Sequence, residues 1–483
     1  MSYVPTIGLE VHAQLNTNTK MFCPCRANYG EEPNTLACPV CLGLPGAMPV
    51  LNGGAIEQTI LTGLMLGCEI NPVSTWDRKN YFYPDMPKNF QLTQMDLPLC
   101  LGGGVPLYEL AYPKDAQKTI LNPGKVVRLN RIHLEEDVGK STHHASYTSV
   151  DFNRAGTPLM EIVTEPDLDT AEEVVAYLGS LRQILVYGGV SDADMEKGQM
   201  RCDVNISVRP EGTTELGEKI ELKNLNSPSA IRRAIHYEVE RQIGVLEDGG
   251  TLKQSTWRWD DDRGETLEMR SKENSDDYRY FPEPDLLPVH TATLKAKAEA
   301  RLPELPHQKE VRFAEAYGLT PYDASVLASE GALADWYEQS AKGHPAPKKV
   351  ANWVTNNLLG QLNETSLEIT DCPISPQALG ALVTLVEDAA VNGNQAKEVF
   401  HSLWETPRED VAALAIEMGF EPADDSEVEA IIDEVLAANA EVVAEIQGGN
   451  PKAAGRLVGL VMKQSGGKAN PRMVSESIAA KLA

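Results

Sequence analysis

The chain has 483 residues, of which 42% are hydrophobic, and its 70 acidic and 43 basic residues give it a formal net charge of −27 at pH 7. A length of this order predicts about three domains, and the apolar content is typical of a globular protein with sizeable cores. The charge argues against a general polyanion-binding protein, because the average field of the molecule repels phosphate, but it leaves room for a local basic patch.

The sequence predicts neither a membrane span nor a leader. It contains no run of about 18 apolar residues, the length that a transmembrane helix needs. The opening MSYVP lacks the basic and apolar regions of a secretory signal. We therefore expect a cytoplasmic protein that does not bind membranes.

Residues 7–15 predict a half-buried β-strand. Apolar residues alternate with polar or small ones, which places Glu10 and His12 on one face with Gly8 and Gln14. A carboxylate and an imidazole two positions apart on one face can share a metal ion or a proton. The alternative is an ordinary solvated face of a sheet.

Four of the eight cysteines crowd into the segment that follows, as a C-x-C pair, twelve residues, and a C-x-x-C pair. Two such pairs can close a tetrahedral site of four thiolates around zinc, and a reducing compartment favours metal over disulfides. Because four thiolates leave zinc no open position, the site would be structural. The alternative is a set of free buried thiols. The candidate ligands are Cys23, Cys25, Cys38 and Cys41.

The spacing of apolar residues predicts a helix at 55–67. A loop-rich passage follows at 78–88, where Arg and Lys residues lie next to a group of aromatic residues. Such a passage suits stacking on a base and contact with phosphate, and an ordered surface loop is the alternative. A similar passage recurs at 276–285.

Strand-like alternation returns at 128–138, 159–164, 201–208 and 219–223. Glu136 shares its face with apolar residues, and Glu161 is flanked by apolar residues in the same way. An unpaired carboxylate there is costly, so a metal or a substrate cation is a candidate partner.

Several strands thus carry charged residues at central positions. If helices cover one face of the sheet, these groups line the other face as a basin for divalent metal and phosphates. A solvated open sheet is the alternative. A P-loop is excluded, because the glycine it needs six residues before Lys140 is replaced by a leucine.

Helical periodicity dominates from about residue 288. Residues 409–445 carry twelve acidic and no basic residues, whereas 446–483 carry six Lys or Arg and one acid. A basic patch on a small helical module there would suffice for phosphate-backbone contacts, with a solvated face as the alternative. The candidate residues for these phosphate contacts are Lys452, Lys463, Lys468 and Arg472.

The chain resembles the B subunit of the glutamine-dependent aspartyl/glutamyl-tRNA amidotransferases over essentially its full length. The resemblance is carried by long motifs at 8–12, 77–85, 133–143, 151–162, 201–207, 221–227, 276–285 and 466–471.

The resemblance implies an α+β protein with a glutamine-synthetase-like cradle on an antiparallel-rich sheet. The cradle would span 1–290 and contain the cysteine knuckle at 23–41, followed by a helical domain at 291–408 and a tRNA-binding helical tail at 409–483. The implied reaction is ATP-dependent phosphorylation of the side-chain carboxylate of Glu-tRNA(Gln) or Asp-tRNA(Asn), followed by amidation. A glutaminase (amidase) partner, the A subunit, would supply the ammonia, and a small C subunit would complete the heterotrimer.

The resemblance also implies site residues. Glu10, His12, Glu136 and Glu161 match positions that line the magnesium and ATP site. Further expected catalytic residues are Asp203 and Glu221, and the residues expected to bind nucleotide or substrate are Lys79, Tyr81, Arg154, Arg201 and Lys223.

The residues agree with this chemistry where they can be compared. A carboxylate is a poor electrophile until phosphorylation gives it a leaving group, and magnesium must then neutralise ATP. The chain lacks an amidase-type serine motif and an obvious Cys–His nucleophile pair, which points to a partner that makes ammonia. The rival interpretations are a non-enzymatic zinc-containing tRNA-binding scaffold and a free-standing ATP-dependent amino-acid ligase or guanidino kinase.

Overall fold

The computed structural model describes residues 2–120, 122, 124–271, 275–420, 425–447, 453–465, 469 and 471–482. Its contacts divide the chain into two compact units, Met1–Pro306 and His307–Ala483. In the part of the chain that the structure describes, no helix is both long and apolar enough to cross a membrane.

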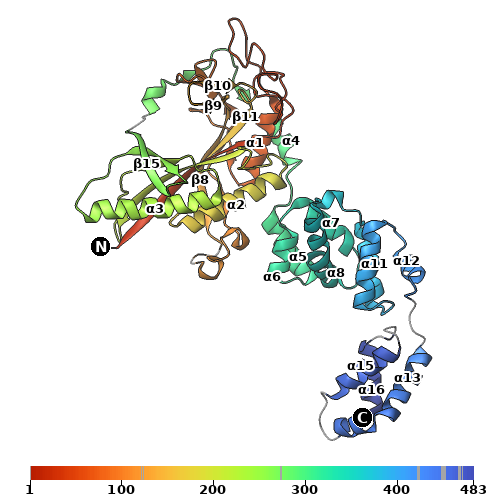
Figure 1. Ribbon diagram of the computed structural model, residues 1–483. Coiled ribbons are helices and arrows are strands. Elements are labelled where there is room, and N and C mark those ends of the chain that lie inside the picture. Colours follow the sequence, from red (N-terminus) through yellow and green to blue (C-terminus); the bar gives the residue numbers. More distant parts are fainter. Residues whose placement is uncertain are drawn as a thin grey trace. The chain divides into compact units, whose positions relative to one another are not determined.

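A ten-stranded sheet organises the first unit, and β1 lies near its middle (Figure 1). The strands follow the order β15-β14-β13-β12-β1-β11-β8-β6-β2, with β7 paired to β8. All these pairs are antiparallel except β13 with β14. The bounds are β1 Tyr3–Gln14, β2 Glu69–Ile70, β6 Cys100–Leu101, β7 Gly104–Pro106, β8 Val126–Glu136, β11 Pro158–Thr164, β12 Met200–Pro210, β13 Ile220–Lys223, β14 Ser255–Asp260 and β15 Glu265–Ser271.

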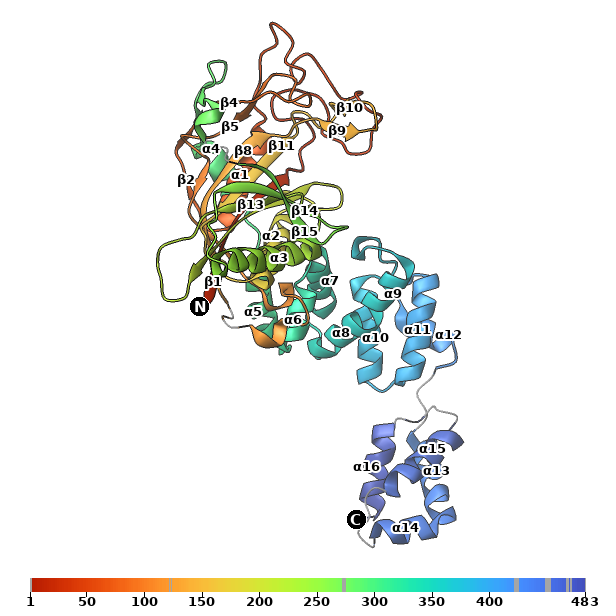
Figure 2. The same ribbon diagram turned by 60° about the vertical axis from the view of Figure 1, so that its left-hand side comes forward.

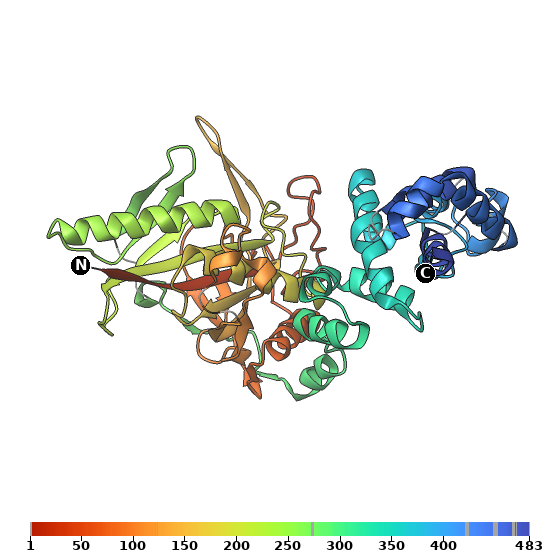
Figure 3. The same ribbon diagram turned by 90° about the horizontal axis from the view of Figure 1, so that it is seen from below.

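Helices α1 (Gly53–Met65), α2 (Ala171–Tyr187) and α3 (Pro228–Glu247) share one hydrophobic core with the apolar face of β1. Side chains of Asn52, Thr170 and Ser227 cap their N-termini by accepting backbone N–H groups. The long yellow-green α3 extends along the sheet in Figures 1 and 3. Because the helices take the apolar face, the polar face of the central strands stays open. The structure also confirms the predicted helix at 55–67 and the predicted strands at 7–15, 128–138, 159–164, 201–208 and 219–223.

The two aromatic passages, far apart in the sequence, come together in a three-stranded sheet of order β16-β4-β5. Phe281 pairs with Arg78 in this sheet, and Arg78 forms two hydrogen bonds with the carboxylate of Glu283. Figure 2 shows β4 and β5 above the main sheet. The smaller elements of this unit are β3 Val73–Ser74, β4 Asp77–Asn80, β5 Phe90–Thr93, β9 Lys140–His143, β10 Thr148–Asp151, β16 Phe281–Pro282, β17 Val289–His290 and α4 Ala292–Glu299.

Helices are the only regular elements in the described residues of the second unit. It has two separate hydrophobic cores, one formed by residues between 313 and 415 and one by residues between 428 and 478. The boundaries 1–290, 291–408 and 409–483 stay a prediction. The helices are α5 Pro306–Tyr317, α6 Pro321–Leu327, α7 Gly331–Ala341, α8 Pro347–Trp353, η4 (a π-helix) Val354–Leu358, α9 Leu359–Thr365, α10 Pro376–Glu387, α11 Gly393–Glu405, α12 Val411–Glu417, α13 Asp425–Ala438, α14 Ala440–Gln447, α15 Ala454–Gln464 and α16 Pro471–Leu482.

Candidate active site

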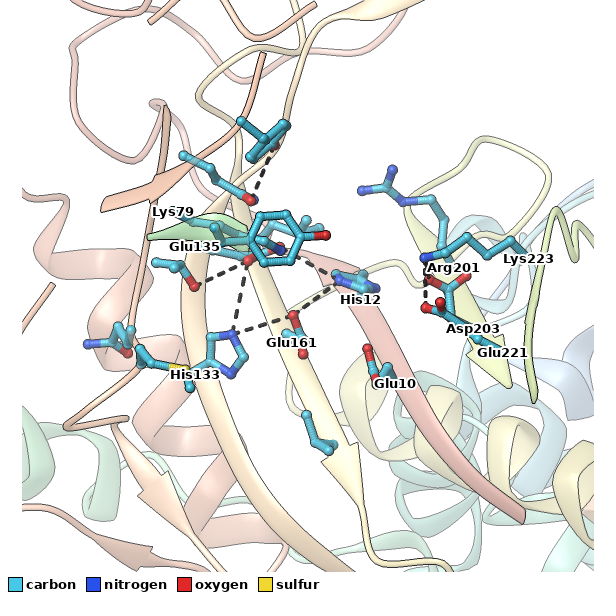
Figure 4. Close-up of a pocket in the computed structure, with 18 of the residues that line it drawn as sticks. Glu10, His12, Lys79, His133, Glu135, Glu161, Arg201, Asp203, Glu221 and Lys223 are labelled. Atoms are coloured by element: carbon cyan, nitrogen blue, oxygen red, sulfur yellow. Dashed lines mark hydrogen bonds and ion pairs between the residues drawn. The ribbon is translucent and has the colours of Figure 1, made fainter. Parts of the chain in front are cut away.

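The polar face of the central strands opens into a cavity of about 520 Å³, which we call the reaction pocket (Figure 4). Strands β1, β8, β11, β12 and β13 supply most of its charged lining, and the aromatic passages supply another wall. Among the residues that the sequence singled out, the pocket is lined by Glu10, His12, Lys79, Tyr81, Glu161, Arg201, Asp203, Glu221 and Lys223.

Strand register explains why these residues meet. His12 of β1 lies opposite Glu161 of β11 on one side and opposite Arg201 of β12 on the other. Glu161 in turn lies opposite His133 of β8. Directly opposed residues point to the same face of a sheet, so four strands contribute one row of polar side chains across the pocket floor.

Glu161 of this row and Glu135, two residues along β8 from His133, are two carboxylates that share two imidazoles. Nε2 of His12 lies 3.3 Å from Glu161 and 3.7 Å from Glu135, and Nε2 of His133 lies 3.4 Å from Glu161. One ligand atom from each of His12, Glu135 and Glu161 lies within 4.8 Å of the others, which makes them a candidate metal-ligand set. We call these three residues the acid–imidazole cluster.

Burial and mutual charge set the protonation of this cluster. Burial lowers the pKa of His12, but the hydrogen bond to Glu161 and the charges of both carboxylates outweigh burial and raise this pKa to about 9. Burial and the charge of Glu161 raise the pKa of Glu135. Burial would also raise the pKa of Glu161, yet His133 and His12 hold it well below its usual range. A divalent cation bound here would let both carboxylates stay ionised.

The structure does not bring Glu136 to this cluster. Glu136 is buried on the opposite face of β8, where its carboxylate pairs with Lys88 and accepts the backbone N–H of Leu92 at 3.0 Å. The cation that compensates this buried carboxylate is therefore a lysine from a distant loop. Glu135, one position earlier, faces the reaction pocket instead.

The remaining predicted residues divide into a charged wall and a separate position. Nζ of Lys223 lies 2.8 Å from Asp203 and 2.9 Å from Glu221. Glu10 lines the pocket and accepts a hydrogen bond from Asn205 at 2.9 Å, but it is not one of the acid–imidazole cluster. Arg154 lies outside the pocket lining and donates to the backbone oxygens of Val138 and Gly139.

The aromatic wall places a cation beside rings. Nζ of Lys79 lies 4.7 Å from the centroid of Tyr278 and 6.0 Å from that of Tyr81. The Tyr81 and Tyr278 rings are 6.2 Å apart in an edge-on arrangement. Lys79 and Tyr81 therefore line the reaction pocket together with Tyr278 from the second aromatic passage, and their role in binding nucleotide or substrate stays a prediction.

Sequence reasoning missed three residues on β8 and just after it. His133, Glu135 and Asp137 alternate with Leu134 and Glu136 along the sequence, so they lie on the face opposite to that of the apolar residues. Asp137 is 2% exposed and its carboxylate is held by Arg201 at 3.0 Å and by Gln14 at 2.8 Å. The available signal was this polar parity, since a pocket face collects residues two apart.

The four cysteines of the knuckle do come together, with sulfur atoms within 4.8 Å of one another. None of these four cysteines forms a disulfide. Four thiolates around zinc at about 2.3 Å each are compatible with this spread, so the donor set fits a closed structural site. A hydrogen bond with Cys23, the backbone N–H of Cys38 and the Lys20 ammonium all lower the pKa of Cys41, to about 4, against an opposing effect of burial.

Lys20 supports this site from beneath. It is fully buried, and its ammonium donates to the backbone oxygens of Leu36 at 2.7 Å and Phe152 at 3.2 Å. Its third contact is the sulfur of Cys41 at 3.8 Å. The knuckle is thereby joined to the turn at 151–157 that carries Arg154.

The structure describes only some of the basic residues predicted in the tail. Lys463 is exposed on α15, whose opposite face is buried at Leu457 and Val461. Lys452 and Lys468 lie outside the described residues, and Arg472 belongs to α16 with a side chain outside the description.

Comparison with known proteins gives a consistent result along the whole chain. Residues 5–295 match the family model described as the GatB/GatE catalytic domain, and residues 335–482 match the model described as the GatB domain. A relative from Methylacidiphilum infernorum is 50% identical over 479 residues, which are 99% of this chain and 98% of the relative. One from Carboxydothermus hydrogenoformans is 47% identical and covers 100% and 99%, respectively.

Both relatives, and one from Opitutus terrae at 47% identity over 99% of each chain, are named as B subunits of aspartyl/glutamyl-tRNA(Asn/Gln) amidotransferase. The residues of the reaction pocket fall within the first matched region. The chain therefore belongs to the family of aspartyl/glutamyl-tRNA(Asn/Gln) amidotransferase B subunits.

Proposed function

We propose that this chain is the ligase component that phosphorylates the side-chain carboxylate of Glu-tRNA(Gln), Asp-tRNA(Asn) or both, and amidates it with ammonia. The observation that carries the proposal is the acid–imidazole cluster in the floor of a cavity that also holds Arg201, Lys223 and Lys79. A carboxylate-rich metal position next to several cations suits a reaction between a nucleotide triphosphate and a carboxylate. The names of the relatives support the choice of an aminoacyl-tRNA as substrate.

Magnesium fits the two carboxylates of the cluster because it prefers oxygen ligands, and His12 would join them as a neutral imidazole after losing its proton. His12, Glu135 and Glu161 would hold it, and Glu10 lines the same pocket. Bound there, the ion would neutralise phosphate charge and polarise the transferred phosphoryl group. Glu136 is left out of this set because Lys88 already pairs with it.

Two groups of residues in the reaction pocket then have separate roles in binding. Arg201 and Lys223, held by Asp137 and by Asp203 with Glu221, present cations fixed in direction to phosphate oxygens. Lys79 with Tyr81 and Tyr278 offers stacking and a positive charge to a base or to the aminoacyl group. Phosphorylation turns the carboxylate into an acyl phosphate, and ammonia displaces phosphate to leave the amide.

Several further features belong to the same proposal. The sheet unit is a glutamine-synthetase-like cradle, and the chain divides at 1–290, 291–408 and 409–483. Zinc occupies the knuckle. A glutaminase partner, the A subunit, supplies ammonia and a small C subunit completes a heterotrimer, as the designation of the relatives as B subunits supports. The tail binds tRNA through its basic residues, so its removal should weaken tRNA binding and flatten its salt dependence.

The test uses the assembled heterotrimer and each mischarged tRNA in turn. We expect magnesium-dependent ATP cleavage that is coupled to amidation of at least one of them. Glu161→Gln keeps the shape of the site and removes one charge, and should lower the amidation rate by about 10²–10³-fold while glutamine hydrolysis persists at a basal level. Amidation at the wild-type rate by Glu161→Gln would refute the assignment of the cluster. Absence of any ATP-dependent amidation would favour the non-enzymatic scaffold.

A further inference from the structure

The reaction pocket contains a second imidazole, that of His133 on β8. This side chain is 4% exposed and lies next to both carboxylates of the acid–imidazole cluster (Figure 4). Its Nε2 is 3.4 Å from Glu161 and 4.0 Å from Glu135. His133 is nevertheless outside the candidate metal-ligand set, in which His12 is the imidazole. A buried donor that contacts metal-binding carboxylates is typical of the outer shell that orients the ligands of a metal.

Arg131 determines which nitrogen of the His133 ring carries the proton. The two residues are two apart on β8 and share a face, and Nε–H of Arg131 donates to Nδ1 of His133 at 3.4 Å. Because a guanidinium can only donate hydrogen bonds, Nδ1 must accept. The ring proton then lies on Nε2, the nitrogen that faces the carboxylate of Glu161. Arg131 thus holds His133 as a hydrogen-bond donor toward Glu161.

The two oxygens of the Glu135 carboxylate have different neighbours. Oε1 faces Nε2 of His12 at 3.7 Å. Oε2 accepts a hydrogen bond from the buried hydroxyl of Thr93 at 3.3 Å, and Nε2 of His133 lies on the same side. The carboxylate is therefore held through one oxygen, while the other is directed toward the imidazole of the metal-ligand set.

The Glu161 carboxylate depends on His133 in the same way. Its Oε2 faces the Nε2 atoms of both His12 and His133, at 3.3 Å and 3.4 Å. A nitrogen that binds a metal cannot donate a hydrogen bond at the same time, so binding of an ion by His12 removes the first of these contacts. The N–H of His133 remains as the imidazole donor to Oε2, which leaves Oε1 of Glu161 for the ion.

We propose that His133 is a positioning residue for the metal of the reaction pocket. Its Nε2–H, fixed in direction by Arg131, holds Oε2 of Glu161 so that this carboxylate binds magnesium through Oε1, and His133 itself does not contact the ion. This inference rests on the proposed function, because it needs a divalent ion at the acid–imidazole cluster. Thr93 holds Oε2 of Glu135 in the corresponding way.

The first test measures metal binding without turnover. Mn2+ takes the same oxygen-rich sites as magnesium, and its EPR signal gives the Kd for the intact heterotrimer in the absence of ATP and tRNA. His133→Leu removes the donor and should weaken Mn2+ binding about 10–100-fold, the effect typical of losing an outer-shell partner. His144→Leu removes an exposed imidazole of the same unit, whose Nε2 contacts Ser149. This matched control should bind Mn2+ as the wild type does.

Two amide variants separate orientation from a loss of folding. His133→Gln places an amide N–H near the position of Nε2 and should retain most of the Mn2+ affinity. His133→Asn carries the same amide on a shorter side chain that does not reach Glu161, and should lose affinity as His133→Leu does. The two amides differ in reach and not in chemistry, so equal affinities in His133→Gln and His133→Asn would overturn the proposal. In amidation assays His133→Asn should need more magnesium for half-maximal activity, while KM for the tRNA changes little.

The second test separates positioning from direct coordination. Pulsed EPR detects the nitrogen of an imidazole that is bound to Mn2+. We expect this signal in the wild type and in His133→Gln, and its loss in His12→Gln. Its loss in His133→Gln would show that His133 is itself a ligand, which overturns the proposal.

Glu161→Gln makes the failure of this inference distinguishable from failure of the proposed function. It removes a ligand charge and should weaken Mn2+ binding at least as strongly as His133→Leu. Weakened binding in Glu161→Gln together with wild-type affinity in His133→Leu would overturn only the role of His133. Unchanged binding in both variants would overturn the metal assignment of the proposed function, and the inference with it.

Discussion

Two places in the sheet unit gather groups that can bind a metal, and they do so in opposite ways. The acid–imidazole cluster mixes two carboxylates with an imidazole on the floor of a cavity of about 520 Å³. The knuckle offers four thiols of one kind, supported by a fully buried lysine. Three carboxylate and imidazole ligands in an open cavity leave room for substrate, whereas four thiolates complete the coordination of zinc.

Ligand type and access thus separate a chemical metal site from a structural one within the same unit. The knuckle is nevertheless not isolated. Lys20 donates to the backbone oxygen of Phe152, and Met21 donates its N–H to the oxygen of Gly156 at 2.7 Å. The turn between Phe152 and Gly156 carries Arg154, so loss of the knuckle should change the position of the Arg154 side chain.

The largest effect is expected at the acid–imidazole cluster. Glu135→Gln removes one of its two carboxylates, and should lower kcat for amidation by about 10²–10³-fold and raise the magnesium concentration needed for half-maximal activity. Glu136→Gln is the matched variant one position along β8. Because Glu136 pairs with Lys88 on the opposite face, its replacement should leave the magnesium dependence unchanged. Titration of activity with magnesium checks both, and equal shifts in the two variants would contradict the placement of Glu135.

The second effect concerns the knuckle. Cys38→Ser leaves three thiolates, so we expect the purified protein to fall from about one zinc per chain to almost none, by the four-ligand requirement. The segment 20–45 should exchange its amide hydrogens faster, while amidation continues in the folded fraction. Elemental analysis and hydrogen exchange measure this. A wild-type protein that contains no zinc would show that the knuckle is a set of free thiols.

The third effect depends on pH and concerns the ion pairs that Asp137 forms with Arg201 and Arg154. Burial raises the pKa of Asp137, but Arg201 and Arg154 outweigh burial and lower it below its usual range. A carboxylate with a depressed pKa in the folded state stabilises the protein above its unfolded pKa of about 3.9, and this contribution is lost as the pH falls through the folded value.

Asp137→Asn should therefore lower the free energy of unfolding of the sheet unit by about 1–3 kcal/mol at pH 7, because it leaves a partly buried arginine without its partner. The difference from wild type should shrink as the pH is lowered below about 4. Denaturant unfolding at several pH values measures it. A difference that stays constant down to about pH 3 would mean that the Asp137 charge does not contribute.

The smallest effect is expected from Lys20→Met, which keeps an apolar stem and removes the ammonium. A zinc–tetrathiolate site carries net negative charge, and Lys20 is positioned to offset it. We expect zinc transfer to a chelator to be about tenfold faster, which is typical of changes to residues around metal ligands. Lys20→Arg retains the charge and serves as the comparison. Equal transfer rates in wild type and Lys20→Met would show that Lys20 only fills space.

Much of the framework could be predicted from the amino-acid sequence alone. Alternation identified the strands at 7–15, 159–164 and 201–208, and helical spacing identified the helix at 55–67, because periods of 2.0 and 3.6 are local properties of the backbone. The spacing of the four cysteines predicted their convergence. Glu10 and His12 were placed on one face correctly, since residues two apart on a strand always share a face.

Which parity of β8 faces the pocket became clear only from the packed molecule. Alternation separates Glu135 from Glu136 but cannot say which face the helices will cover, and Lys88, which pairs with Glu136, comes from a segment 48 residues earlier. Local sequence patterns likewise could not predict that the two aromatic passages meet, or that Arg154 lies outside the lining of the reaction pocket. Each depends on pairings between distant strands, and register across strands is set by packing of the whole sheet rather than by any one segment.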